Sequence, residues 1–267
     1  MTHPREEVRA GLQTDRPHSA RFWNYLLGGK DNHPVDSEAG EVILKTFPEF
    51  AAVARLQRRF LARAVRFLAD TAGVRQFLDI GTGLPTADNT HELAQRIAPE
   101  SRIVYVDNDP LVLVHAQALL TSSTEGACAY VDADVRAPEH ILAEAAKTLD
   151  LSRPVALTML GIMGQISDAE RPAGLVSTLM SALPPGSYLA LSDGTNTNEA
   201  LNTAVGVYNG QSANTYHLRS PQEIASFFAG LELVEPGVVP TAAWRPDADR
   251  AQEDTADVSV CGVAVKK

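Results

Sequence analysis

Three aspartates that follow apolar runs are the residues of this chain whose types and spacing could do chemistry. Asp79 stands in FLDIGTG, Asp107 follows RIVYV, and Asp134 follows ACAYVDA. Gly81 and Gly83 follow Asp79 at two and four positions, and glycine permits unusual φ values and the close approach of a ligand. Carboxylates at strand ends can accept hydrogen bonds from a nucleoside, so the pattern predicts a nucleotide-like ligand.

The residues after Gly83 indicate which nucleotide-like ligand is expected. A dinucleotide turn has the pattern G-x-G-x-x-G or G-x-G-x-x-A, whereas Thr86 holds the third position here and Pro85 interrupts the motif. No G-K-[ST] follows, so a phosphate-binding loop is excluded. Asp79 would repel a phosphate but suits a cation. A ligand with adenosine, a positive sulfur and no phosphate fits best, and S-adenosylmethionine is that ligand.

Each acid has an expected partner on this ligand. Asp107 lies where an acid can accept hydrogen bonds from both ribose hydroxyls. Asp134 could accept one from the adenine amino group, while the Val135 N–H reaches a ring nitrogen. A single acid at a strand end is common on protein surfaces, but three at successive strand ends favour a ligand site. Further expected cofactor contacts are Thr82, Asn108 and, at the end of the run 154–160, Leu160.

Alternating strand-like and helical patterns must position these residues. The strand-like runs are 74–80, 102–107, 127–131, 154–160 and 187–193, and the helical patterns lie near 87–97, 110–120, 138–149 and 168–182. This alternation predicts a mostly parallel sheet covered by helices on both faces. Asp109-Pro110 and the pairs Ser167 with Glu170 and Ser220 with Glu223 are typical of helix starts. After a short helix near 221–229, the runs 231–240 and 257–265 have no helix between them, which predicts an antiparallel end of the sheet.

The first 70 residues have no strand pattern and predict a helical N-terminal arm, followed by an α/β domain over 71–267. A helix from Ser19 should end at Gly28-Gly29, a second helix should be capped by Asp36, and a third should cover 49–69. The turn in YLLGGKDNHPVD is either an exposed turn after a helix or a lid over the site. In the lid reading, Lys30 or Arg21 meets the methionine carboxylate, and Asn32 or Tyr25 bonds to the cofactor.

Composition limits the partners and the compartment. The formal charge of −10 argues against nucleic acid, and the arginines of RLQRRFLARAVR (55–66) read as the solvated face of an amphipathic helix. Two cysteines without metal-binding spacing indicate a reducing cytoplasm, and the polar N-terminus does not resemble a signal peptide. No apolar run approaches the length of a membrane span, and the seven scattered histidines predict no metal site.

Two resemblances follow from these motifs. FLDIGTG, VYVDNDP and DADVR resemble the first three motifs of class I S-adenosylmethionine-dependent methyltransferases, over about residues 70–267. RFWNYLLGGKDNHPVD, RSPQEIASFFAGLELVEPGVV and WRPD are similar, over nearly the whole chain, to a bacterial S-adenosyl methyltransferase family formerly catalogued as a domain of unknown function. The resemblance implies a Rossmann-like, seven-stranded, mostly parallel sheet with an antiparallel last strand and a helical lid. It implies no particular acceptor.

The expected reaction is an in-line displacement at a sulfonium methyl group, which needs alignment more than a catalytic group. MLGIMGQI lacks the N/D-P-P-[YF] motif of adenine and glutamine methyltransferases, so those acceptors are disfavoured. Met159, Leu160, Ile162 and Met163 form either an apolar wall for a hydrophobic small molecule or ordinary core. Candidate bases or acceptor contacts are His33, Asp193, Tyr208 and His217, and the segment 194–220 is a candidate acceptor wall.

Three functions remain open from the sequence. The first is a methyltransferase that acts on a small-molecule acceptor. The second is a sensor or regulator that binds S-adenosylmethionine without transferring its methyl group. The third, an NAD-dependent oxidoreductase, is disfavoured by Pro85 and Thr86.

Overall fold

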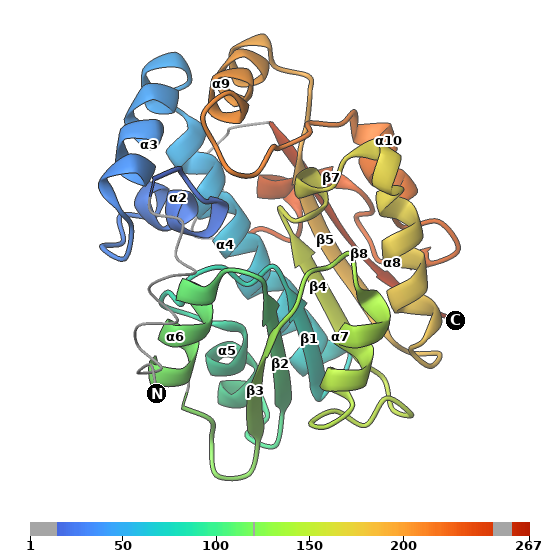
Figure 1. Cartoon of the computed structure of the whole chain (residues 1–267). Helices are drawn as coiled ribbons and strands as arrows, with labels where there is room; N and C mark the ends of the chain where they lie inside the picture. Colours follow the sequence, from blue (N-terminus) through green and yellow to red (C-terminus); the bar gives the residue numbers. More distant parts are fainter. Residues whose placement is uncertain (1–14, 120, 248–257) are drawn as a thin grey trace.

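The computed structural model describes residues 15–119, 121–247 and 258–267. In these ranges one eight-stranded sheet has the order β3-β2-β1-β4-β5-β8-β6, with β7 also paired to β8 (Figure 1). The strands β1 to β5 are parallel to one another, and β8 is antiparallel to β5. The strands are β1 Gln76–Ile80, β2 Arg102–Asp107, β3 Ala127–Asp132, β4 Ala156–Leu160, β5 Tyr188–Gly194, β6 Glu232–Leu233, β7 Val239–Pro240 and β8 Ser259–Val265.

The predicted mostly parallel sheet with an antiparallel last strand is confirmed, but its outer edge is divided. Both β6 and β7 pair with β8, so Leu233 faces Ala264 and Val239 faces Cys261. Between them the backbone turns, with the Gly237 N–H donating to the carbonyl of Val234 at 2.9 Å. Proline and glycine in this segment do not suit a continuous strand. The run 231–240 therefore forms two short strands, and the sheet has eight strands rather than seven.

Helices cover both faces of the sheet. They are α2 Ser19–Leu26, α3 Pro34–Thr46, α4 Phe50–Arg66, α5 Thr90–Ile97, α6 Pro110–Leu119, α7 Pro138–Ala145, α8 Pro172–Ser181, α9 Glu199–Asn209 and α10 Pro221–Ser226. Phe77 of β1 packs with Phe60 of α4 in one buried cluster. Its neighbour Leu78 packs with Ile141 of α7 and Val176 of α8 in another. Because successive strand residues point to opposite faces, both faces need apolar side chains, which explains the continuous apolar runs.

Several helix boundaries differ from the predicted ones for local reasons. The helix α5 begins at Thr90, not at 87, because Asn89 takes the cap position and its N–H donates to Glu92 at 2.8 Å. The predicted helix 168–182 is divided at Arg171, whose φ of 51° is left-handed, so α8 begins at Pro172. The helix α7 is four residues shorter than predicted at its C-terminus. Leu120, Asp257 and most of the polar stretch 241–256 lie outside the described residues.

The helices α2 and α3 lie at the end of the sheet where β4 and β5 finish (Figure 1). Phe22 of α2 and Ile43 of α3 share a buried cluster with Leu201 of α9. The predicted stop after α2 is confirmed, with Gly28 at a φ of 77°. Asp36 is not the N-cap residue of α3, which begins at Pro34, but its carboxylate accepts a hydrogen bond from the N–H of the N-cap residue His33 at 2.9 Å and so completes a capping box. The helix α4 packs on the sheet itself, so the division into an arm (1–70) and an α/β domain (71–267) stays a prediction.

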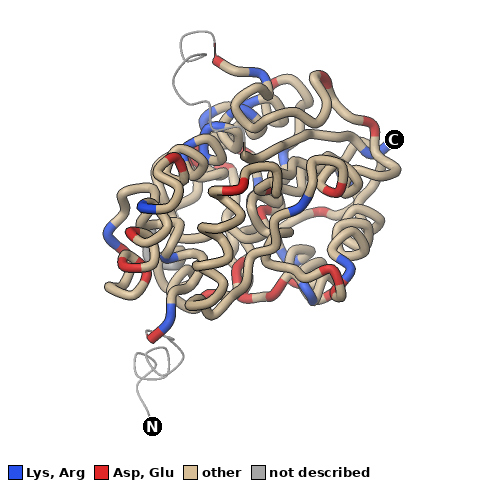
Figure 2. Tube along the Cα trace, turned by 90° about the horizontal axis from the view of Figure 1, so that it is seen from above, with Lys and Arg blue, Asp and Glu red and all other residues tan. Residues whose placement is uncertain are grey.

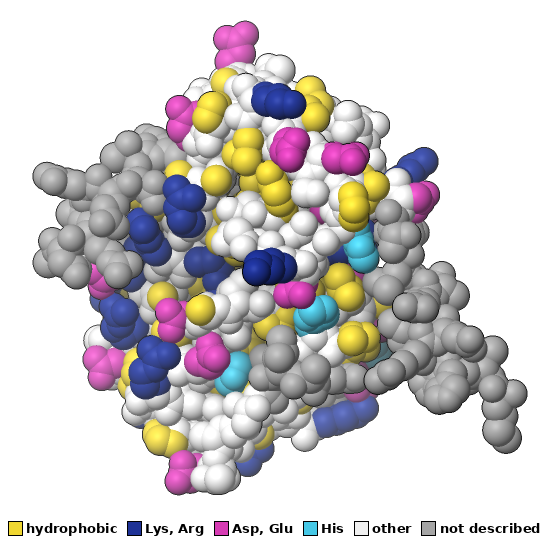
Figure 3. All heavy atoms as spheres, turned by 90° about the vertical axis from the view of Figure 1, so that its left-hand side faces the viewer, with side chains coloured by type: hydrophobic (Ala, Val, Ile, Leu, Met, Phe, Trp, Pro, Cys, Tyr) yellow, Lys and Arg dark blue, Asp and Glu magenta, His cyan; other side chains and the backbone are white. Residues whose placement is uncertain are grey.

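Charged side chains of both signs are interspersed along the described trace (Figure 2). Lys and Arg gather at one edge of the face in Figure 3. On α4, Arg55 and Arg66 are exposed. Arg63 of the same helix turns inward and donates to the carbonyl of Trp244 at 2.7 Å. The predicted solvated arginine face therefore holds for only part of α4. Within the described chain, no helix combines the length and the apolar character needed to cross a bilayer.

Candidate active site

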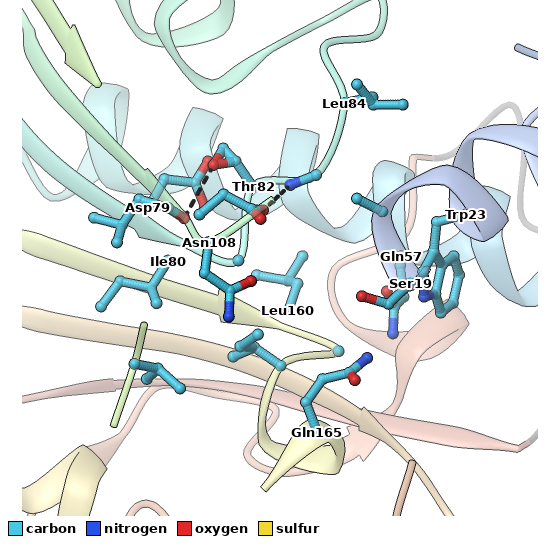
Figure 4. A pocket seen from close by; sticks show the side chains of 18 of the residues that line it. Ser19, Trp23, Gln57, Asp79, Ile80, Thr82, Leu84, Asn108, Leu160 and Gln165 are labelled. Carbon is cyan, nitrogen blue, oxygen red and sulfur yellow. Dashed lines mark hydrogen bonds between the residues drawn. The ribbon is translucent and has the colours of Figure 1, made fainter. Parts of the chain in front are cut away.

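A cavity of about 1180 Å³, measured with its opening to solvent, lies beyond the carboxyl ends of β1 to β4. The strand order reverses between β1 and β4, which is where open parallel sheets bind ligands. Figure 4 shows Asp79, Thr82 and Asn108 on the strand side of this cavity and Ser19, Trp23 and Gln57 across from them. The space is therefore enclosed between the sheet and the N-terminal helices α2 and α4.

The glycine turn after β1 needs its two glycines for different reasons. Gly81 and Gly83 both have positive φ, 73° and 66°. A Cβ at Gly81 would come within 2.8 Å of Ile162 Cδ1, whereas a Cβ at Gly83 would meet nothing within 4 Å. Gly83 thus borders open space on the cavity side. The Gly81 N–H donates to the carbonyl of Val106 at 2.8 Å, so β2 holds the turn in place.

Asp107 connects the end of β2 to this turn. Its carboxylate accepts hydrogen bonds from the backbone N–H of Gly83 at 2.8 Å and of Asp109 at 3.0 Å. Burial raises the pKa of Asp107, and the two N–H donors oppose that shift. A carboxylate has about four lone-pair positions, so two remain for other donors. Asp107 can accept from a pair of ribose hydroxyls without losing its structural contacts.

The residues expected to contact adenine lie at the end of β3. Asp134 is half-buried and accepts hydrogen bonds from Asn108 Nδ2 and the Arg136 N–H, each at 2.8 Å. Val135 beside it is buried, and all four residues line the cavity. Leu160 at the end of β4 lines the same cavity. The structure therefore brings together every strand-end residue that the sequence indicated for the cofactor.

Asp79 is the most buried acid of the cavity, with 7% of its surface exposed. It accepts hydrogen bonds from Thr90 Oγ1 at 2.6 Å and Thr158 Oγ1 at 2.7 Å. Burial raises the pKa of Asp79, while the two hydroxyls and the nearby Arg58 oppose that rise. A buried carboxylate held by two hydroxyls presents negative charge to a cation in the cavity.

Arg58 of α4 also lines the cavity, which corrects the predicted solvated position of this arginine. It is half-buried and donates to the carbonyls of Ala87 at 3.2 Å and Asp88 at 2.9 Å. Burial lowers the pKa of Arg58, with Asp79 opposing this shift. Ala54 and Leu61 lie on the same helical stripe and also line the cavity. That spacing is the signal by which Arg58 could have been found.

The four lid residues singled out in the sequence do not line this cavity. Arg21 is buried and its Nε donates to Asp36 Oδ2 at 3.0 Å. Asn32 Nδ2 donates to Asn24 Oδ1 at 2.9 Å, and the Tyr25 ring lies against Gly40 of α3. Lys30 is exposed in the turn.

The helix α2 contributes to the cavity through different residues. Ser19, Trp23 and Asn24 line it. Arg21 and Tyr25 belong to this helix but not to its cavity side, and the turn that carries Lys30 and Asn32 does not line the cavity.

A second cavity of about 510 Å³, again measured with its opening, adjoins the first. It shares Ser19, Trp23, Gln57 and Gln165 with the first cavity, and α9 contributes its Tyr208. Of the other candidates, His33 lies just before α3 and lines neither cavity, and His217 borders a separate surface groove.

Asp193, at the end of β5, is buried behind the second cavity. It accepts a hydrogen bond from the Gly164 N–H at 2.8 Å and another from the Tyr216 hydroxyl. Burial raises the pKa of Asp193 to about 6. Tyr216 itself lines the second cavity, so Asp193 reaches that cavity only through the tyrosine.

The predicted apolar wall is divided between core and cavity. Met159 and Met163 are fully buried in the core, whereas Leu160 and Ile162 line the first cavity. Across residues 15–119, 121–247 and 258–267, no group of three or more His, Cys, Asp or Glu is arranged to hold a metal ion.

Comparison with known proteins identifies the family. The S-adenosyl methyltransferase family model matches residues 5–267. The crystal structure of a DUF574 family protein from Streptomyces avermitilis is similar, with a TM-score of 0.92 and 45% identity over 95% of this chain and 99% of that chain. The structure of a candidate methyltransferase from Thermobifida fusca has a TM-score of 0.88 and 37% identity, over 100% of both chains. Among proteins of curated function, none matches this chain in sequence.

The family match confirms the predicted activity and cofactor, and neither the sensor nor the oxidoreductase alternative gains support. The matched range includes all the strand-end residues that line the cavity, and the similar structures share the fold that positions them. This chain therefore belongs to the S-adenosyl methyltransferase family and is an S-adenosylmethionine-dependent methyltransferase.

Proposed function

We propose that the enzyme holds S-adenosylmethionine in the cavity beyond β1 to β4 and methylates a small-molecule acceptor. The observation that carries the proposal is the convergence of Asp79, Asp107 and Asp134 with Arg58 around one space. These groups provide acceptors for hydroxyl and amino groups and one cation for a carboxylate. The donor set fits an adenosyl amino acid, and Gly83 leaves room beside it.

In this arrangement each end of the cofactor has its own residues. Asp107 accepts hydrogen bonds from the ribose hydroxyls, and Asp134 with the Val135 N–H recognises the adenine. Arg58 pairs with the methionine carboxylate, because Arg58 is the arginine of α4 that lines the cavity. Asp79 attracts the positively charged part of the ligand.

Bound S-adenosylmethionine supplies an electrophilic methyl group on a positively charged sulfur. The protein must then align the acceptor and exclude water, and alignment of this kind is worth roughly 7–11 kcal/mol. Trp23, Leu160 and Ile162 are apolar side chains of the cavity that can exclude water. A general base would add about 10²–10⁴-fold, and only for an acceptor that must lose a proton.

A small molecule is the acceptor that best fits the surroundings of the cavity. The space beside the cofactor cavity is a second cavity between helices, and charges of both signs are interspersed along the described chain. The formal charge of −10 does not favour a nucleic acid. We also propose a bacterial cytoplasm as the compartment, because Cys128 and Cys261 are both free thiols.

Transfer from labelled cofactor into a fractionated cell extract tests this function. The enzyme is incubated with [methyl-14C]S-adenosylmethionine and an extract of Streptomyces avermitilis, which is then separated by size. Label in the small-molecule fraction is the expected result. Label confined to protein or nucleic acid would contradict a small-molecule acceptor.

A further inference from the structure

The second cavity has aromatic walls. Phe22, Trp23, Phe50, Tyr208 and Tyr216 line it, and we call it the aromatic cavity. The ring centroids of Phe22 and Tyr208 lie 4.8 Å apart, and those of Trp23 and Phe50 lie 5.9 Å apart. These rings come from α2, α4, α9 and the segment after α9. Rings at these distances pack directly against one another, so together they form a continuous apolar wall, against which a flat, apolar occupant can lie.

The lining of the aromatic cavity carries no charge. Among the described residues that border it, none is Asp, Glu, Lys, Arg or His. A charged ligand would lose its hydration there without gaining a partner, which is costly. The occupant that the lining favours is therefore neutral.

Two polar atoms at the aromatic cavity lack a hydrogen-bond partner. The Tyr208 hydroxyl and Gln165 Oε1 are both buried and make no hydrogen bond in the described structure. Burial raises the pKa of Tyr208 to about 12, so its hydroxyl is neutral. The nearby Ser212 hydroxyl opposes part of this rise. Buried polar atoms are nearly always bonded. These two atoms therefore point to polar groups on a ligand.

Gln165 stands where the two cavities meet, because it lines both. Its side chain points into the cofactor cavity toward Leu160 and Gln57 (Figure 4). A carboxamide oxygen only accepts hydrogen bonds, so its partner must carry an O–H or N–H group. A group bonded to Gln165 therefore lies at the junction of the two cavities.

We propose that the aromatic cavity binds the methyl acceptor, which is a neutral, flat, largely apolar molecule. Its nucleophilic hydroxyl or amino group donates to Gln165, and a second polar group meets the Tyr208 hydroxyl. This inference rests on the proposed function, since it assigns the first cavity to the cofactor. In the reaction the acceptor's lone pair bonds to the methyl carbon, the carbon–sulfur electron pair returns to sulfur, and the acceptor's proton passes to water.

Three two-ring probes test the class of acceptor by calorimetry on enzyme saturated with S-adenosylhomocysteine. We expect 2-naphthol to bind, 2-methoxynaphthalene to bind more weakly because it has no O–H for Gln165, and 2-naphthoate to bind at least ~10-fold more weakly than 2-naphthol because of its charge. Equal affinity for 2-naphthol and 2-naphthoate, or no binding of 2-naphthol, would overturn the proposal.

Variants of α9 show whether the probe occupies the aromatic cavity. Val205 lines it, whereas Val207 on the same helix is 36% exposed and does not. Val205→Trp should lower 2-naphthol affinity at least ~10-fold by filling space, and the matched Val207→Trp should leave it unchanged. Both should bind S-adenosylhomocysteine within about twofold of the parent. Equal losses of 2-naphthol affinity in the two variants would contradict the location.

Gln165→Met provides a test that does not depend on a larger side chain. It removes the amide and keeps the length of the side chain, so 2-naphthol should lose its advantage over 2-methoxynaphthalene. A retained advantage would contradict the role of Gln165. Failure of S-adenosylhomocysteine to bind the parent enzyme would instead overturn the proposed function, so the two failures are distinguishable.

Discussion

The carboxylate of Asp107 accepts a hydrogen bond from the backbone N–H of Gly83 at 2.8 Å, across 24 positions of the chain. The acid proposed to bind the ribose therefore also holds the turn that borders the cofactor cavity. Because one side chain has both roles, its removal should affect the ligand and the shape of the turn together. Four predictions follow from contacts of this kind in the site and the helices around it.

Asp107→Ala should weaken S-adenosylhomocysteine binding by about 1–3 kcal/mol, since it removes a charged acceptor and leaves the Gly83 N–H without its partner. Isothermal calorimetry measures this loss. Asp132→Ala is the matched control, because Asp132 pairs in register with Asp107 but is exposed and does not line the cavity. Similar affinities of the Asp107 variant and the parent would remove Asp107 from the ribose site.

Arg58→Ala should weaken binding of S-adenosylhomocysteine but leave binding of 5′-methylthioadenosine nearly unchanged. The second ligand lacks the amino acid part, so it has no carboxylate for Arg58 to meet. Calorimetry with both ligands separates these effects. Arg55→Ala on the exposed side of α4 should change neither affinity. If the two ligands lose affinity equally in Arg58→Ala, Arg58 does not recognise the carboxylate.

Asp193 should make stability fall as pH rises between about 4 and 6. Burial raises the pKa of Asp193 from 3.8 to about 6, so the folded protein binds this proton more tightly than the unfolded chain. The stability gained is complete below pH 3.8, and it is lost as pH rises through about 6. Two pKa units correspond to about 3 kcal/mol.

Asp193→Asn has no ionisable group at this position and isolates the effect. The free energy of unfolding of the parent, relative to this variant, should decline by about 2–2.5 kcal/mol from pH 4 to pH 7.5. Urea titrations at several pH values give this difference. A difference that stays flat, or that grows with pH, would show that the Asp193 carboxyl is not destabilised by burial.

Asp36→Ala should destabilise the packing of α2 against α3. Asp36 is fully buried and accepts hydrogen bonds from the His18 N–H at 2.9 Å, the His33 N–H at 2.9 Å and Arg21 Nε at 3.0 Å. Removing one partner of a buried ion pair costs about 3–5 kcal/mol. Urea unfolding measures the cost, and Glu38→Ala on the exposed side of α3 is the control. Equal stabilities of the two variants would show that Asp36 does not hold these helices.

The strand-end residues could be predicted from the sequence because their positions follow from local pattern and topology. Asp79, Asp107 and Asp134 each follow an apolar run, and parallel strands separated by helices end at one edge of the sheet. The broken edge strand was harder to predict, because the run 231–240 is apolar enough for a strand and its division depends on Pro236 and Gly237. Local composition therefore predicts which helices and strands form better than it predicts the residues at which they begin and end.

The helical contributions to the site could not be predicted as well, because they depend on how whole helices are oriented. Arg58 and Arg55 belong to one basic run, and only the packing of Phe60 against the sheet directs the first inward and the second outward. Likewise, α2 meets the cavity through Trp23 rather than Arg21, since Arg21 pairs with Asp36 of the next helix. These long-range contacts leave no short motif in the sequence.

A crystal structure of the enzyme with S-adenosylhomocysteine tests the central claim most directly. The account predicts density for the adenosyl group in the cavity beyond β1 to β4, with ribose at Asp107 and adenine beside Val135. Ligand density elsewhere on the molecule, with this cavity holding only water, would contradict the account.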